Sequence, residues 1–156
     1  MTFATLPESV CVDANVFIAA FGPQEAFHEE ASEFLVWMKE RQVFFFEPDV
    51  VIFEVSSVLH RKALEEAGSS SETRQLLRLF FGLPLLLQWQ EDIFLKAIAH
   101  AKKASSRSIS DSLYLAVAES RGIPLVTLDD QLLRRGRASY RKVMTPRTFL
   151  DGFLPR

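Results

Sequence analysis

The sequence has almost no cysteine and no long uninterrupted apolar run. Cys11 is the only cysteine among 156 residues, which excludes an intrachain disulfide and a thiolate-rich metal site. We expect its side chain to be a small buried apolar group in the first strand. The longest apolar stretch, residues 79–87, is much shorter than the ~18 residues of a membrane helix and is interrupted by Gly82 and Pro84. No secretory signal is visible, so we expect a cytoplasmic location and no membrane association.

The chain also lacks a strong excess of either charge. It carries 18 basic and 20 acidic residues, a formal net charge of −2, which does not favour nucleic-acid binding by the chain as a whole. The distribution is uneven, because residues 134–156 hold seven basic residues and one acid, while residues 1–133 hold the remaining 11 basic and 19 acidic residues. This basic end is either a phosphate-binding surface or an ordinary solvated face. Its first candidates for phosphate contacts are Arg134, Arg135 and Arg137.

Short apolar runs alternate with helical patterns, which predicts an α/β fold with a central, mostly parallel, twisted sheet covered by helices on both faces. The length suits one domain, residues 1–156. We expect strands at 9–13, 42–47, 83–89, 123–130 and 140–146, and helices at 14–22, 24–40, 49–68, 73–82, 90–104 and 107–122.

Local signals set the expected helix faces and ends. In the helix at 24–40, the spacing puts one apolar stripe on Phe27, Phe34, Leu35 and Met38. Three further expectations concern helix ends: Pro48 lies in a first turn, Ser110 is an N-cap, and Gly68 and Gly122 each follow a last turn.

Four acids occur where the pattern does not require them. Asp13 and Asp129 follow predicted strands, and the ligand cleft of such sheets lies beyond the carboxyl ends of the strands. Glu54 interrupts the apolar stripe of its helix and needs a partner, for which Arg61 on the same helix is a candidate. Asp111 begins a helix, where the helix dipole alone favours a negative charge. Taken singly, each acid also has such an ordinary structural explanation.

Together, these carboxylates would repel one another at one edge of the sheet unless a cation lay among them. Oxygen ligands without a matching histidine or cysteine cluster favour Mg²⁺ or Mn²⁺ over zinc, and the three histidines are scattered without ligand spacing. A divalent ion held in this way is one means of hydrolysing a phosphodiester.

Three segments, "VDANVFI" (12–18), "FEVSSVL" (53–59) and "SDSLYLAVAESRGIPLVTLDDQLL" (110–133), resemble the PIN-domain nucleases. The resemblance is strongest to the small single-domain type that includes the VapC toxins, and it extends from residue 10 to about residue 146. It implies a parallel sheet with the first strand central, and cleavage of RNA with Mg²⁺ or Mn²⁺. Many members of the family are toxins that an antitoxin protein inhibits, and many are dimers. The resemblance therefore also implies an antitoxin as a candidate partner, and a homodimer.

The resemblance assigns roles to individual residues. The catalytic and metal-binding acids would be Asp13, Glu54, Asp111 and Asp129. Supporting roles would fall to Asn15, Thr127 and Asp130, and the basic residues Arg134, Arg135 and Arg137 would hold the RNA backbone.

Other functions are weighed against this one. A PIN-like interaction module without activity would use the Phe-rich segments, with 14 phenylalanines in all, as a contact surface. A phosphotransfer enzyme of the haloacid-dehalogenase type expects an aspartate at the position of Asn15. A response-regulator receiver needs a lysine after a late strand, and residues 123–130 contain none.

Overall fold

Strands and helices alternate along the chain. The computed structural model describes residues 5–65 and 70–153. The elements are β1 (Ser9–Val12), α1 (Ala14–Phe21), α2 (His28–Glu40), β2 (Phe44–Pro48), α3 (Val50–Glu65), α4 (Ser70–Phe81), β3 (Leu85–Gln88), α5 (Glu91–Lys103), α6 (Ser110–Arg121), β4 (Leu125–Val126), α7 (Asp130–Ser139), β5 (Val143–Met144) and α8 (Pro146–Asp151).

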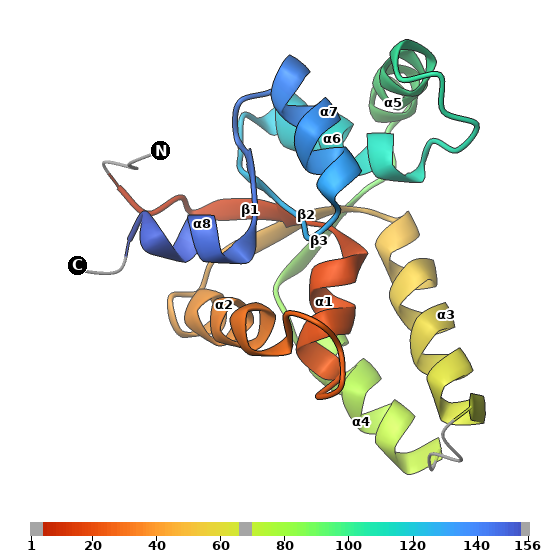
Figure 1. Ribbon diagram of the computed structural model, residues 1–156, viewed down its shortest axis with the longest axis vertical. Helices are drawn as coiled ribbons and strands as arrows, with labels where there is room; N and C mark the ends of the chain where they lie inside the picture. The colour runs from red at the N-terminus through yellow and green to blue at the C-terminus, as the bar shows by residue number, and fades with distance from the viewer. Residues whose placement is uncertain (1–4, 66–69, 154–156) are drawn as a thin grey trace.

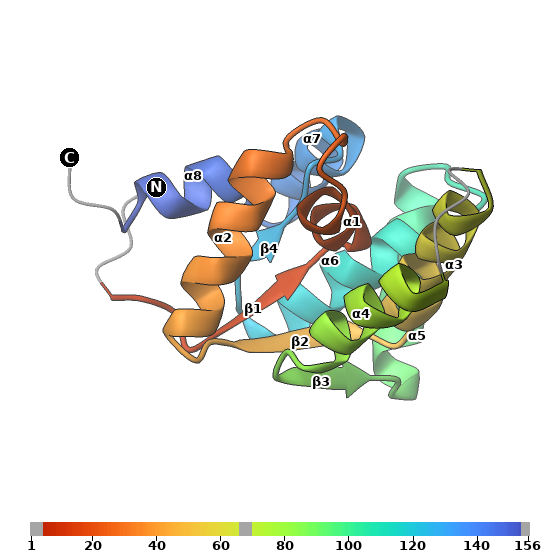
Figure 2. The same ribbon diagram turned by 90° about the horizontal axis from the view of Figure 1, so that it is seen from below.

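The strands form one sheet in the order β3-β2-β1-β4-β5, and every neighbouring pair is parallel. The apolar first strand is therefore central, as expected, with β2 on one side and β4 on the other (Figure 2). Because all strands run in the same direction, the residues that follow β1 and β4 come out at the same edge of the sheet.

Helices cover both faces of the sheet. Figure 1 views the molecule with α5, α6 and α7 above the strands and α1, α2 and α4 below them. The predicted α/β class with a parallel sheet is thus confirmed. No helix in the described part of the chain is long and apolar enough to cross a membrane.

Aromatic rings fill the layer below the sheet. Phe17 of α1 lies between the rings of Phe45 and Phe80, with centroid separations of 5.9 and 5.1 Å. Phe149 of α8 packs edge-on against Phe34 of α2 at 5.3 Å. These five rings are fully buried, so this part of the phenylalanine content is core.

The helix α6 forms the opposite layer and is buried at every position from Ser112 to Ala118. Such a helix, enclosed between the sheet and α5, can hold the residues of its first turn in a fixed place relative to β1 and β4. It ends at Gly122, whose φ of 67° is the left-handed conformation that glycine adopts at least cost, as predicted. Cys11 is likewise fully buried in β1, as expected.

Three local predictions were wrong. Pro48 is the last residue of β2, not part of a helix, because α3 starts only at Val50. Ser110 is the first residue of α6 and not its N-cap, and its own N–H is instead met by the Ser108 hydroxyl at 3.3 Å. Phe27 precedes α2 in a left-handed conformation and is exposed, so it leaves the predicted stripe. The predicted end at Gly68 lies outside the described residues.

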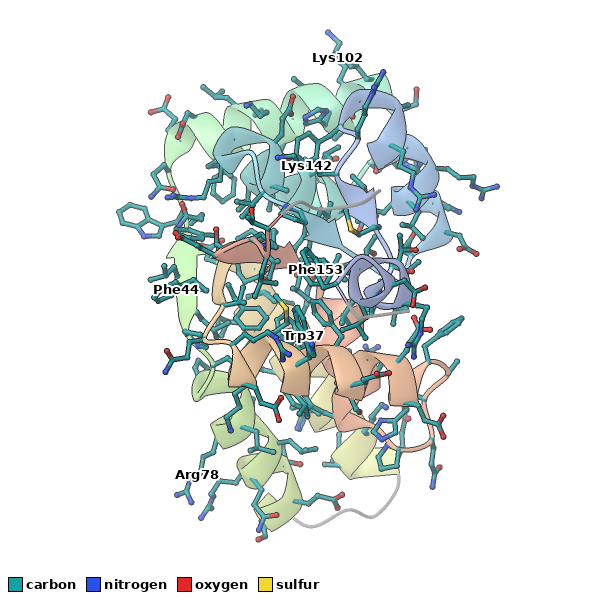
Figure 3. The ribbon with its side chains drawn as sticks, turned by 90° about the vertical axis from the view of Figure 1, so that its left-hand side faces the viewer. Trp37, Phe44, Arg78, Lys102, Lys142 and Phe153 are labelled. Carbon is teal, nitrogen blue, oxygen red and sulfur yellow. The ribbon has the colours of Figure 1, made fainter. Side chains whose placement is uncertain are left out.

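Two helices were not predicted. The strand predicted for residues 123–130 is only the pair Leu125–Val126, and α7 follows it, where no helix was predicted. The chain then adds α8, which packs against α2 through ring contacts. Figure 3 shows the same region from the side, where Trp37 of α2 and Phe153 lie close together.

Candidate metal site at the carboxyl edge of the sheet

Four acidic residues from separate segments line one cleft of about 620 Å³, which we call the acid cleft. Asp13 comes directly after β1, at the N-cap position of α1 but without a side-chain capping bond, and Glu54 projects from α3. Asp111 is in the first turn of α6, and Asp129 is the N-cap of α7. The fold thus brings together all four acids that the sequence singled out.

Asp13 is the most enclosed of the four, with 6% of its surface exposed. Its backbone N–H donates to the carbonyl of Val126 at 2.9 Å, and its Oδ2 accepts the hydroxyl of Thr127 at 2.7 Å. Burial raises the pKa of its carboxyl to about 7, and the negative charges of Asp111 and Glu54 add to this, although the Thr127 bond acts in the opposite direction. With its pKa at about 7, this carboxyl keeps a proton more readily than an ordinary aspartate, and an added cation would favour its charged form.

Thr127 connects three of the polar residues at this edge. Its buried hydroxyl donates to Asp13 and accepts the backbone N–H of Asp129 at 3.0 Å and the side-chain amide of Asn15 at 3.4 Å. The Asn15 carbonyl in turn accepts the N–H of Leu128 at 3.2 Å. Asn15 and Thr127, to which the family resemblance assigns supporting roles, thus both lie at the edge of the sheet that carries Asp13.

Asp129 both caps α7 and lines the acid cleft. Its Oδ1 accepts the backbone N–H of Leu132 at 2.8 Å, which caps α7, so this oxygen is committed to the helix. The carboxylate still borders the acid cleft. Its neighbour Asp130, an exposed residue in the first turn of α7, is not among the residues that line the cleft.

Glu54 is paired differently from the expectation. The hydroxyl of Tyr114, on α6, donates to Glu54 Oε2 at 2.5 Å, whereas no ion pair joins Glu54 to Arg61 in the described residues. Burial and the charge of Asp111 raise the pKa of Glu54, while the Tyr114 bond lowers it. The pKa of Tyr114 is itself raised by burial and by nearby carboxylates, so the phenol remains protonated and donates.

Asp111 lies at the more open side of the cleft. It is exposed as a residue, yet desolvation raises the pKa of its carboxyl, and the charge of Asp129 raises it further. The positive charge of Arg135, which lines a neighbouring cavity together with Asp111, lowers it. Of the other two predicted phosphate ligands, Arg137 donates from Nε to the carbonyl of Val143 at 2.9 Å.

The donor set fits a hard divalent cation, because the acid cleft offers carboxylate oxygens and an amide and contains no histidine or cysteine. Burial, and after it the charges of neighbouring acids, raise the pKa values of Asp13, Glu54 and Asp111, and a cation would relieve the repulsion. Within residues 5–65 and 70–153, however, no group of three or more His, Cys, Asp or Glu side chains is close enough together to hold a metal ion.

A fifth carboxylate was missed by the sequence analysis. Glu47 of β2 is fully buried, accepts the backbone N–H of Val12 at 2.7 Å, and lies 3.7 Å from the Cys11 sulfur. Burial raises its pKa well above the ordinary value for glutamate. The available signal was an acid at the end of an apolar strand, the same signal that identified Asp13.

One comparison with known proteins identifies a family. The family model for the PIN domain matches residues 10–138. A search of curated protein sequences finds no significant relative.

Several solved structures have a similar fold. PAE2754 from Pyrobaculum aerophilum is 20% identical, with a TM-score of 0.65 over 94% of this chain and 89% of that one. The Mycobacterium tuberculosis toxin VapC20, described as cleaving the sarcin-ricin loop, is 16% identical, with a TM-score of 0.62 over 79% of this chain and 92% of that one. A toxin-antitoxin complex from Klebsiella pneumoniae is 18% identical, with a TM-score of 0.59 over 88% of this chain and 97% of that one.

Proposed function

The chain belongs to the PIN-domain family, and on that premise we propose that it is a metal-dependent ribonuclease whose acid cleft hydrolyses RNA phosphodiester bonds. The observation that carries this proposal is the meeting of Asp13, Glu54, Asp111 and Asp129 in one cleft. Bringing four carboxylates from distant segments together costs free energy, because their negative charges repel one another. Helix capping gives a structural reason for the position of Asp129 only, so a functional reason is expected for the cluster. We propose that residues 1–156 form one such domain.

The four acids would hold Mg²⁺ or Mn²⁺, with Asp13 as the most desolvated ligand. When bound, the ion would neutralise charge on the phosphate and lower the pKa of a bound water. Thr127 fixes the Asp13 carboxylate, and Asn15 ties the loop that carries Thr127 to the start of α1. Glu54, with a raised pKa and a donor from Tyr114, is the candidate to take up a proton from the attacking water.

The protein would act as the toxin of a toxin-antitoxin pair in the cytoplasm. This rests on solved structures of similar fold, which include a toxin and a toxin-antitoxin complex. An antitoxin protein and a second copy of the chain are its proposed protein partners, and RNA is its proposed substrate.

A second candidate is an inactive PIN-like module that binds other proteins. It is favoured by the absence, in the described residues, of a ready-made group of three metal ligands. It is opposed by the desolvated Asp13 and its specific bond to Thr127, which an interaction surface does not require.

The deciding experiment incubates the purified chain with a mixed RNA pool, with and without Mn²⁺, and sequences the cut ends. Two variants conserve structure: Asp13→Asn keeps the shape of the side chain, and Asp129→Asn keeps a good N-cap. The matched control is Asp92→Asn, in the exposed first turn of α5. We expect metal-dependent cutting that both site variants abolish and the control retains.

Other results would contradict this function. Equal cleavage by the wild type and both site variants would show that the acids are assigned wrongly. No cleavage together with no calorimetric Mn²⁺ binding would favour the interaction module. A phosphorylated Asp13 after incubation with a small phosphodonor would favour phosphotransfer.

A further inference from the structure

The helix α3 presents three side chains of different chemistry to the acid cleft. Phe53, Ser57 and Arg61 all line it together with the four acids. They follow one another at intervals of four residues, so they form a stripe along one side of the helix. At 1.5 Å per residue, the stripe is ~12 Å long, which spans several nucleotides of a stacked strand that rises ~3.4 Å along its axis per nucleotide.

Packing of the core does not explain why a phenylalanine occupies position 53. It is 73% exposed, more than any other large apolar side chain in the described residues. The core contacts of α3 come from Val51, Val55 and Leu59. Burying a phenylalanine is worth about 1.5–3 kcal/mol, and this residue gains little of that. An exposed ring at the margin of the acid cleft is instead free to contact a ligand.

Arg61 is also free to contact a ligand. In the part of the chain that the structure describes, its guanidinium has no hydrogen-bond or ion-pair partner. Among the described residues that line the acid cleft, Arg61 is the one basic side chain, and its planar donors match a phosphate.

A second cavity borders the acid cleft at Asp111. It has a volume of about 560 Å³, lies among α5, α6 and α7, and shares Asp111 with the acid cleft. Its lining includes Lys103 and Arg135 and several serine hydroxyls, groups that suit a sugar-phosphate chain. The acids therefore have a cationic side chain on either side, Arg61 in one cavity and Lys103 with Arg135, which also donates to Gln131, in the other.

We propose that single-stranded RNA crosses the acids from Arg61 to Lys103 and Arg135, with one unpaired base stacked on the ring of Phe53. The inference rests on the proposed nuclease function and adds to it how the strand is held. Aromatic stacking requires a base that is free of a partner strand, so a duplex would not use Phe53. The aromatic ring and the arginine together favour RNA over a protein partner, which has no regular array of phosphates.

The test measures RNA affinity without catalysis. Every variant is made in an Asp13→Asn background, without divalent ions, so that nothing is cut during the titration. Fluorescence anisotropy reports binding of a short labelled single-stranded RNA and of the same RNA as a duplex. The site variants are Phe53→Leu, which keeps an apolar side chain, Phe53→Trp, which keeps an aromatic one, and Arg61→Gln.

Matched controls come from other parts of the surface. Phe44, 48% exposed, begins β2 at the opposite edge of the sheet, and Arg78 is an exposed arginine of α4; both are labelled in Figure 3. We expect Phe44→Leu and Arg78→Gln to bind RNA like their parent. Thermal melting of each variant shows that it is folded.

The expected result is that Phe53→Leu weakens single-strand binding about tenfold or more, while Phe53→Trp restores it and shows tryptophan quenching by RNA. Arg61→Gln should weaken RNA binding and make its affinity less dependent on salt, because about one counterion fewer is released on binding. If Phe53→Leu binds as tightly as its parent while the wild type cuts RNA, the inference fails and the nuclease function stands. If no variant binds RNA and the wild type cuts none, both fail. If Phe53→Leu leaves RNA affinity unchanged but converts a dimer into a monomer, the ring belongs to an interface between copies.

Discussion

Replacing Thr127 with valine removes one hydroxyl and leaves the size of the side chain almost unchanged. That hydroxyl is fully buried and makes three bonds, donating to Asp13 and accepting from the backbone of Asp129 and the amide of Asn15. A hydrogen bond to a charged group contributes about 1.5–3 kcal/mol and a neutral one about 0.5–1.5 kcal/mol. Allowing for the added methyl group and the long third bond, we expect Thr127→Val to lower the free energy of unfolding by roughly 2–4 kcal/mol.

The assay is urea unfolding followed by circular dichroism, with RNA cleavage measured on the same samples. Thr127→Ser is the matched variant, because it keeps the hydroxyl and loses only a methyl group, at a cost of about 1 kcal/mol. Cleavage by Thr127→Val should fall roughly 10- to 100-fold, since the Asp13 carboxylate loses its only side-chain anchor among the described residues. Equal stability and equal activity of Thr127→Val and wild type would refute the view that Thr127 organises this edge.

The remaining predictions concern stability. Burial raises the pKa of Glu47, so the folded protein keeps a proton that the unfolded chain releases above pH ~4.3. Glu47→Gln should therefore match the wild type near pH 4 and become progressively more stable than it toward pH 7, by at most ~1.4 kcal/mol per pH unit; a constant difference in urea unfolding across this range would contradict it. Phe149→Ala should cost about 3–5 kcal/mol, because the ring is fully buried against α2, and a change below 1 kcal/mol would show that α8 is not part of the core. Gly122→Ala should cost about 1 kcal/mol through its positive φ alone, since a Cβ there meets no atom within 4 Å; an unchanged melting temperature would exclude that strain.

The acids could be predicted from the sequence because each departs from a strong local pattern. Asp13 follows the apolar run Val10–Val12, and Glu54 interrupts an apolar helix stripe, so both stand out without knowledge of the fold. The parallel order of the strands then brings Asp13 and Thr127 to one edge although 114 residues separate them. The site roles of these residues are still a prediction.

Pairings across the fold could not be predicted in the same way. Tyr114 occupies an ordinary apolar position of α6, and nothing near it in sequence indicates that its hydroxyl meets Glu54, 60 residues away. Glu47 reads as the polar end of a strand, and its burial depends on how closely β2 approaches Val12 and Cys11.

The missed helices have a different cause. The segment of α7 is mostly polar and contains Gly136, which weakens a helical pattern. The glycine lets α7 lie close to β5, where an added Cβ would be 3.0 Å from a methyl carbon of Val143 and would require that side chain to shift. In α8, Thr145 caps the helix and Pro146 occupies its first turn. Both signals are present in the sequence, but the helix has only six residues, too few to show a helical apolar pattern.

The central claim is that the acid cleft is a divalent metal site. The most direct measurement is a crystal structure of the wild type grown with Mn²⁺, with anomalous diffraction to locate the ion. We predict an anomalous peak between Asp13, Glu54, Asp111 and Asp129, absent in Asp13→Asn crystals grown in the same way. An empty acid cleft at saturating Mn²⁺, or a peak only elsewhere on the protein, would contradict the account.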